Sequence, residues 1–230
     1  MRVLFIGNSH TFFNDMPATF RHMAAELTGE EPEVTMLAYG GRSLNWHREE
    51  FPAPRFALLH GRYDYCVLQQ QTHPFPPEEE TRDPAQWFLD LCREAGTTPV
   101  LYETWAERDK PEHLEPIRGV FRRLAEESGA LLAPVGEVFA ALRQARPDID
   151  LYWQDGAHTS PYGAYAAAAC FARLLCRAAP LAPLSETAWA FSPVPGAAGG
   201  FHHVGSERVS LDREQTRAIL AAVEAAIPLG

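Results

Sequence analysis

Residues 2–11 read R-V-L-F-I-G-N-S-H-T, a short apolar run that stops at Gly7 and continues into polar residues. An apolar run of this length, bounded by glycine and polar residues, is typical of a buried strand. Pro17 follows at a place where a helix can begin, because the first helical turn tolerates a missing N–H. The stretch therefore predicts a strand, a tight turn and a helix.

The same alternation recurs along the chain. Five short runs predict buried parallel strands, at residues 2–6, 33–38, 65–69, 99–103 and 130–133. Helices are predicted at residues 17–28, 45–59, 84–95, 111–128, 135–145 and 161–178. Such alternation predicts a parallel sheet covered on both faces, so we expect an α/β fold. The expected architecture is a three-layer, flavodoxin-like α/β/α sandwich with about five parallel strands.

The composition fits one acidic domain. The chain has 230 residues and a net charge of −10, which argues against nucleic acid as a partner because phosphate backbones repel an acidic protein. We expect a single domain over residues 1–230 with a Pro/Gly-rich loop over 180–206. A C-terminal helix is expected over about 212–228, with Asp212 as its N-cap and Gln215 returning the capping contact.

Two features bear on location. Only residues 3–6 are apolar before polar residues begin, so no signal peptide is visible. The longest uncharged run, 187–206, holds too many prolines and glycines for a membrane span. Four cysteines lie in apolar surroundings without zinc-ribbon spacing: Cys66, Cys92, Cys170 and Cys176. We therefore expect reduced thiols, a cytoplasmic protein and no membrane partner, and the oligomeric state stays open.

Candidate catalytic groups follow the predicted strands, at the edge of a parallel sheet where ligands bind. Ser9 follows the first strand and is a candidate nucleophile. A hydroxyl on a turn between strand and helix can project toward a substrate, and the Ser9 N–H can point at an anion. A serine that caps a helix is the alternative interpretation.

A second candidate group lies far along the chain, just before the predicted helix at 161–178. Asp155 lies three residues before His158, so a short turn can bring the carboxylate to Nδ1 of the imidazole. That contact fixes the tautomer of a histidine that acts as a base. The alternative is an Asp-Gly turn that caps the following helix beside a surface histidine.

Residues after the second and third strands are candidate oxyanion donors. Gly41 lacks a Cβ and allows close backbone approach, although Gly40 and Gly41 can simply form a turn. The side-chain NH₂ of Gln71 or Gln69 can supply a further donor, and the two share a face of an extended segment. Three consecutive glutamines at the end of a buried strand need partners, which indicates a polar site.

Two further residues are candidates for substrate binding. Trp105 can form one wall of a pocket, with core packing as the alternative. Arg42 can bind an anionic group of a substrate, with a solvated surface arginine as the alternative. Nine histidines invite a metal site, but no pair has the spacing of H-E-x-x-H, so we expect neither a metal nor another cofactor.

The order of these groups resembles the SGNH hydrolase superfamily of GDSL-type esterases. The resemblance covers about residues 3–178 and rests on G-N-S-H-T around Ser9, then a glycine, an amide residue, and D-x-x-H near the C-terminus. It implies a flavodoxin-like α/β/α fold and ester hydrolysis through a Ser-His-Asp arrangement. By motif, Ser9 is the nucleophile and first oxyanion donor, Gly41 the second donor, and Asp155 and His158 the acid and base.

The third block departs from this family. The usual Gly-x-Asn-Asp is absent, and Q-Q-Q-T-H at residues 69–73 stands in its place. Gln71 is our choice for the third donor, with Gln69 and His73 as alternatives. Together with G-N-S in place of G-D-S, this indicates a less-characterised branch. We expect a serine hydrolase for small acyl esters, with acetylated carbohydrates as one candidate. A non-catalytic small-molecule or carbohydrate binding module is the alternative.

Overall fold

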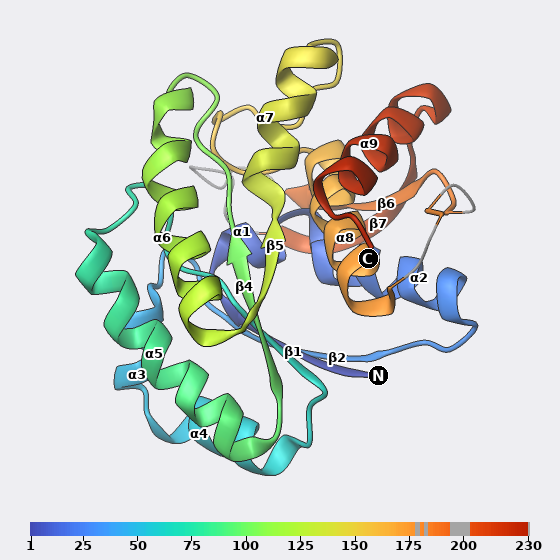
Figure 1. Ribbon diagram of the computed structural model, residues 1–230. Helices are drawn as coiled ribbons and strands as arrows, with labels where there is room; N and C mark the ends of the chain where they lie inside the picture. Colours follow the sequence, from blue (N-terminus) through green and yellow to red (C-terminus); the bar gives the residue numbers. More distant parts are fainter. Residues whose placement is uncertain (178–179, 182–183, 194–202, 230) are drawn as a thin grey trace. The chain divides into compact units, whose positions relative to one another are not determined.

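The computed structural model describes residues 1–177, 180–181, 184–193 and 203–229 (Figure 1). Five parallel strands form one sheet in the order β2-β1-β3-β4-β5. The strands are β1 (Arg2–Gly7), β2 (Glu33–Ala38), β3 (Tyr65–Leu68), β4 (Thr98–Glu103) and β5 (Leu131–Pro134). This is the strand order of flavodoxin-like doubly wound sheets, so the predicted three-layer α/β/α class is confirmed.

The helices alternate with the strands as predicted, with two changes at prolines. They are α1 (Ser9–Phe12), α2 (Met16–Thr28), α3 (Leu44–Glu49), α4 (Pro52–Gly61), α5 (Glu78–Ala95), α6 (Leu114–Ser128), α7 (Val135–Ala145), α8 (Pro161–Cys176) and α9 (Arg213–Ala226), with 3-10 turns η1 (Phe13–Asp15) and η2 (Pro111–His113). The helix predicted over 45–59 is two helices, because Pro52 has no N–H to continue the first one and lies at the start of the second. α5 begins at Glu78, so Pro84 lies inside it.

The chain divides into two compact units, which are described separately. The first comprises Met1–Thr11 and Pro32–Glu137, and the second comprises Phe12–Glu31 and Val138–Gly230. The first unit holds the five-stranded sheet, and its helices α5 and α6 contact strands β3, β4 and β5. No helix in the described part of the chain is both long and apolar enough to cross a membrane.

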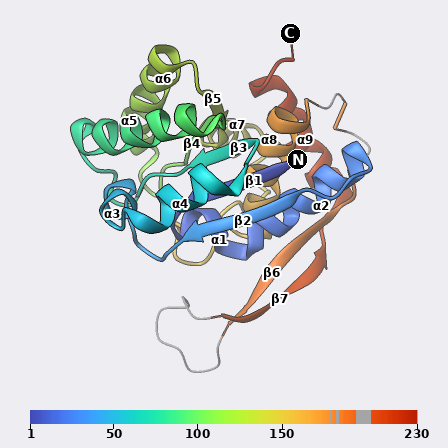
Figure 2. The same cartoon turned by 90° about the horizontal axis from the view of Figure 1, so that it is seen from below.

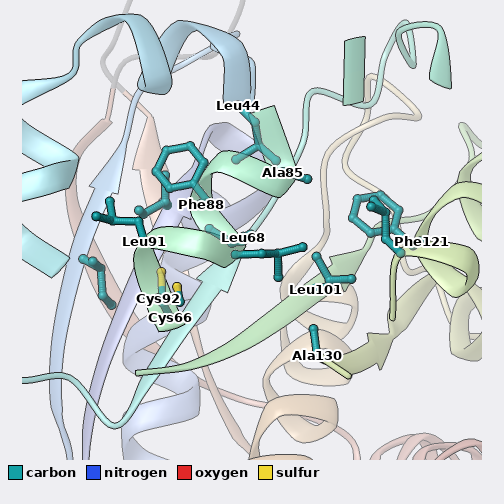
Figure 3. Packing of buried hydrophobic residues seen from close by; sticks show 14 of the residues in the cluster. Leu44, Cys66, Leu68, Ala85, Phe88, Leu91, Cys92, Leu101, Phe121 and Ala130 are labelled. Carbon is teal, nitrogen blue, oxygen red and sulfur yellow. The ribbon is translucent and has the colours of Figure 1, made fainter. Parts of the chain in front are cut away.

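The core of the first unit lies between the sheet and these two helices. Figure 3 shows Leu68 of β3, Leu101 of β4 and Phe88 of α5 in this cluster of buried side chains. Cys66 and Cys92 lie side by side in this cluster, and burial and the contact with Cys92 raise the pKa of the Cys66 thiol. A thiol in such a site stays protonated and unreactive, as expected of a core cysteine.

β2 differs from the prediction of a buried strand. It pairs only with β1 at the edge of the sheet, and all six of its residues are exposed or half-buried. Met36 is 42% exposed. The apolar run at 33–38 therefore predicts the strand correctly and its burial wrongly, because an edge position depends on strand order rather than on the run itself.

The second unit contains the alanine-rich helix α8, which contacts α2, α9 and β6. Its first turn lies close to the chain at Leu151, since a Cβ at Gly163 would be 2.1 Å from the Leu151 carbonyl oxygen. At α9, Asp212 Oδ1 accepts a hydrogen bond from Gln215 N at 2.9 Å, which is the predicted N-cap. The Gln215 side chain does not return the contact; it donates to Asp148 O at 3.3 Å.

The structure corrects the prediction of a loop over 180–206. Strands β6 (Thr187–Pro193) and β7 (His203–Ser210) run side by side as an antiparallel ribbon, with Phe191 opposite Ser206 (Figure 2). Residues 182–183 and 194–202 of the predicted loop lie outside the described residues. The aromatic residues Trp189 and Phe191 suit a strand once a partner strand is present.

Candidate active site

Ser9 is the first residue of α1 and is 5% exposed. Gln69 holds the turn that carries it, since Gln69 Oε1 accepts hydrogen bonds from Asn8 N at 2.7 Å and Thr11 Oγ1 at 3.0 Å. Gly7 leaves room for this contact: a Cβ there would lie 2.5 Å from the same Oε1. Gln69 is fully buried, so its amide acts as an internal brace for the Ser9 turn.

The Gly41 turn lies beside the Ser9 turn in the same unit. Gly41 has φ +69°, and Arg42 N donates to Tyr39 O at 3.1 Å, which together define a type II turn that favours glycine. Asn8 Nδ2 donates to Arg42 O at 2.9 Å and ties the two turns together. The Arg42 guanidinium lies 5.0 Å from the ring of Trp46 and is exposed to solvent.

Gln70 braces the next layer of the first unit. Its Oε1 accepts from Leu44 N at 2.9 Å and from Gln71 N at 2.8 Å. Its Nε2 donates at 3.1 Å to Glu80 O, the carbonyl that Pro84 cannot bond within α5 because proline has no N–H. The buried amides of Gln69 and Gln70 thus have partners, as expected, and both amides serve the scaffold.

Gln71 differs from its two neighbours in its exposure. Its side chain is half-exposed, and its Nε2 donates only a long hydrogen bond to Pro74 O at 3.4 Å. Gln71 also lines a cavity of about 660 Å³ in the first unit. The other lining residues are Ser43, Asn45, Arg48, Gln70, Pro74, Phe75, Pro76, Pro77, Glu79, Glu80, Asp83 and Pro84.

Trp105 and His73 lie in a buried ring cluster with His10. Trp105 has no exposed surface, and its ring centroid is 5.2 Å from that of His10, which fits the packing interpretation. His73 Nε2 lies 3.0 Å from Trp105 O, and His73 Nδ1 lies 3.0 Å from His10 Nε2. Since a carbonyl only accepts, His73 donates from Nε2, and both nitrogens of its ring have protein partners.

The structure brings Asp155 and His158 together in the second unit. His158 Nδ1 lies 2.7 Å from Asp155 Oδ2, and Asp155 Oδ1 accepts from the backbone nitrogens of Ala157 and His158, each at 2.9 Å. Partial burial acts to raise the pKa of Asp155, but the bonds from the His158 ring and the two amides outweigh it and lower this pKa below its ordinary value. The carboxylate therefore stays ionised beside the imidazole.

The loop around this pair is closed at both ends. Tyr152 and Thr159 form an antiparallel bridge, and Gly156 takes a left-handed conformation with φ +71° between them. The cap of α8 is Ser160, whose Oγ accepts from Gly163 N at 3.2 Å. The Asp-Gly turn therefore does not cap the helix, and the Asp155 side chain is committed to His158 and its loop.

Sequence reasoning missed two residues of the second unit. The Phe13 ring stacks on the His158 ring with centroids 4.5 Å apart and planes 29° apart. Asn14 Nδ2 donates to Thr159 O at 2.8 Å. The left-handed conformation of Asn14, φ 50°, is one that asparagine adopts more readily than most residues, but the sequence holds no signal for its partner.

Each half of the candidate site therefore forms within its own unit. Ser9, Gly41 and the glutamines belong to the first unit, and Asp155 and His158 belong to the second. Within the described residues, no three His, Cys, Asp or Glu side chains cluster as metal ligands would.

Comparisons with known proteins identify the family. No family model matches the chain, and no curated protein matches it. A protein from Slackia heliotrinireducens, described as "a putative SGNH hydrolase", is 31% identical, with a TM-score of 0.65 over 76% of this chain and 98% of that one. A DUF4886 family protein from Bacteroides uniformis is 18% identical, with a TM-score of 0.70 over 98% and 94% of the two chains. An acetyl xylan esterase shares the fold at 16% identity, with a TM-score of 0.59 over 74% and 98%. The identity to nearly the whole Slackia protein shows that the chain belongs to the SGNH hydrolase superfamily.

Proposed function

We propose that this protein is a serine hydrolase that cleaves small acyl esters, with Ser9 as nucleophile, His158 as base and Asp155 as the acid that orients the base. The Asp155–His158 contact of 2.7 Å carries the proposal. A carboxylate on Nδ1 fixes the tautomer in which Nε2 takes a proton, and it steadies the imidazolium that forms.

The continuity of the chain supports a meeting of Ser9 and His158. Phe13 stacks on His158 and lies four residues after Ser9. Four residues span at most about 14 Å even when fully extended, so the length of this segment does not prevent the proposed pairing of Ser9 with His158.

In the proposed reaction, His158 Nε2 takes the proton of the Ser9 hydroxyl while Oγ attacks the ester carbonyl carbon. The tetrahedral intermediate collapses as His158 gives this proton to the leaving alcohol. Water then attacks the acyl-enzyme, with His158 as base once more, and releases the acid and Ser9.

The oxyanion is bound by the N–H groups of Ser9 and Gly41 and by Gln71 Nε2. The half-exposed amide of Gln71 supports this choice over Gln69, whose amide braces Asn8 and Thr11. It also supports Gln71 over His73, whose two ring nitrogens have partners.

Acetyl groups on a carbohydrate are the proposed substrate. The acetyl xylan esterase with the same fold supports this, as does the cavity that Gln71 lines. A binding module without turnover is the second candidate, favoured by the missing Asn of the third block.

Hydrolysis of p-nitrophenyl acetate by wild type, Ser9→Ala and the control Ser128→Ala tests the proposal. Ser9→Ala should lower kcat about 10⁴- to 10⁶-fold, because the triad acts as a unit, and Ser128→Ala should leave it unchanged. Equal rates in wild type and Ser9→Ala would remove Ser9 from the mechanism. A fluorophosphonate that leaves the folded wild type unlabelled would favour the binding module.

A further inference from the structure

The amide of Asn14 joins three segments of the second unit. Its Nδ2 donates to Thr159 O at 2.8 Å, and its Oδ1 accepts from Phe191 N on β6 at 3.0 Å. Asn14 is 1% exposed, so both bonds are shielded from water. Loss of this side chain would leave a buried carbonyl and a buried N–H without these partners.

Asn14 and its partner Thr159 are each next in sequence to a residue of the Phe13–His158 ring contact. Thr159 directly follows His158, and Phe13, whose ring stacks on His158, directly precedes Asn14. The segment 13–14 therefore contacts the segment 158–159 twice, through stacked rings and through a hydrogen bond. Ser9 lies on the four-residue helix α1, which ends at Phe12 immediately before this double contact.

We propose that Asn14 is a positioning residue that holds the loop of His158, and with it the imidazole, in the orientation that the proposed reaction needs. The inference rests on the proposed function. The Asn14 amide fixes the start of the segment that leads back to Ser9 against the loop that carries His158. The bond to Phe191 gives the β6–β7 ribbon a part in holding the same contact.

The backbone conformation of Asn14 is also consistent with a positioning role. Its φ of 50° is left-handed, a conformation that asparagine adopts more readily than most residues and that the two side-chain bonds of Asn14 help to hold. Asp15 is left-handed too, with φ 48°, but its side chain accepts from Ser206 Oγ on β7 at 2.6 Å. These adjacent residues share a conformation and a neighbouring ribbon, and Asn14 is the one bonded to Thr159.

This pair provides a matched test. Asn14→Gly removes the side chain and keeps a residue suited to φ 50°, and Asp15→Gly does the same next door. Asn14→Asp keeps an acceptor for Phe191 N–H but places an oxygen against Thr159 O. The measurements are kcat and KM for p-nitrophenyl acetate, and the rate and final extent of fluorophosphonate labelling.

Both Asn14 variants should lower kcat and the labelling rate about 10- to 100-fold, because small misplacements of reacting groups are costly. KM should stay within about twofold, and labelling should still reach completion, which loss of folded protein would prevent. Wild-type kcat in both Asn14 variants, or an equal loss in Asp15→Gly, would overturn the inference. Equal kcat values for wild type and Ser9→Ala would instead overturn the proposed function, and the inference with it.

Discussion

The two halves of the candidate site are built in different ways. The nucleophile half, Gly7–Thr11 with Gly41 and residues 69–71, is held by amide hydrogen bonds between residues up to 61 positions apart. The base half, Asp155–His158 with Phe13 and Asn14, has its central bond between residues three positions apart. The first needs the assembled sheet, whereas a single loop brings the Asp155–His158 pair together.

This difference predicts different failures. A change at the Asp155–His158 pair should remove catalysis and leave the fold intact, because the pair lies on a loop. A change in the glutamine brace should lower stability and activity together, because the brace is buried.

Asp155→Asn should have the largest effect on activity in this comparison, about 10⁴-fold in kcat, because an amide cannot hold the required imidazole tautomer. The variant should fold at neutral pH, and Asp148→Asn is the surface control. The lowered pKa of Asp155 adds a pH signature. The stabilisation is present above the unfolded pKa of about 3.9 and is lost as pH falls through the folded pKa. The Tm gap to wild type should therefore close in acid; a kcat within tenfold of wild type would contradict the assigned role.

Gln71→Ala and Gln69→Ala sharpen the contrast inside the nucleophile half. Loss of an oxyanion donor should lower kcat about 10²- to 10³-fold, so Gln71→Ala should show this loss with an unchanged Tm. Gln69→Ala should instead cost about 1 to 3 kcal/mol of unfolding free energy, since Asn8 N–H loses its buried acceptor, and lower kcat less. Kinetics and thermal melts of both variants measure this. The reverse pattern would make Gln69 the donor.

Glu103→Gln should have the smallest effect of these changes, on the thermal stability and not on the chemistry of the site. Glu103 lies in the first unit, which also holds Ser9. Burial, aided by the nearby charge of Glu137, raises the pKa of Glu103 to about 8. Glu103 Oε2 is the one buried side-chain oxygen within the described residues that lacks a hydrogen-bond partner. The folded state thus holds a proton that the unfolded chain releases near pH 4.5, so stability falls as pH rises from there to about 8. Glu103→Gln should raise Tm at pH 8 and change it little at pH 5; a lower Tm at pH 8 would contradict this.

The sequence alone predicted the sheet, its strands and the positions of Ser9, Asp155 and His158, because these depend on short-range patterns. Apolar runs specify strands locally, and a spacing of three residues suffices for a carboxylate to reach an imidazole. The strand predicted at 33–38 matches β2 residue for residue, and the helix predicted at 161–178 begins at Pro161 as α8 does. Even the cap of α9 at Asp212 follows from local spacing.

Tertiary structure decided what depends on partners distant in the chain. The register that sets Ile6 beside Leu68 also sets Gln69 under the Ser9 turn, which turned a candidate donor into a brace. The strand order places β2 at the edge of the sheet and so leaves it exposed. The pairing of β6 with β7 forms strands in part of the predicted loop over 180–206. Asn14 shows the limit most plainly: a hydrogen bond across 145 residues has no local signature, because only folding creates the acceptor.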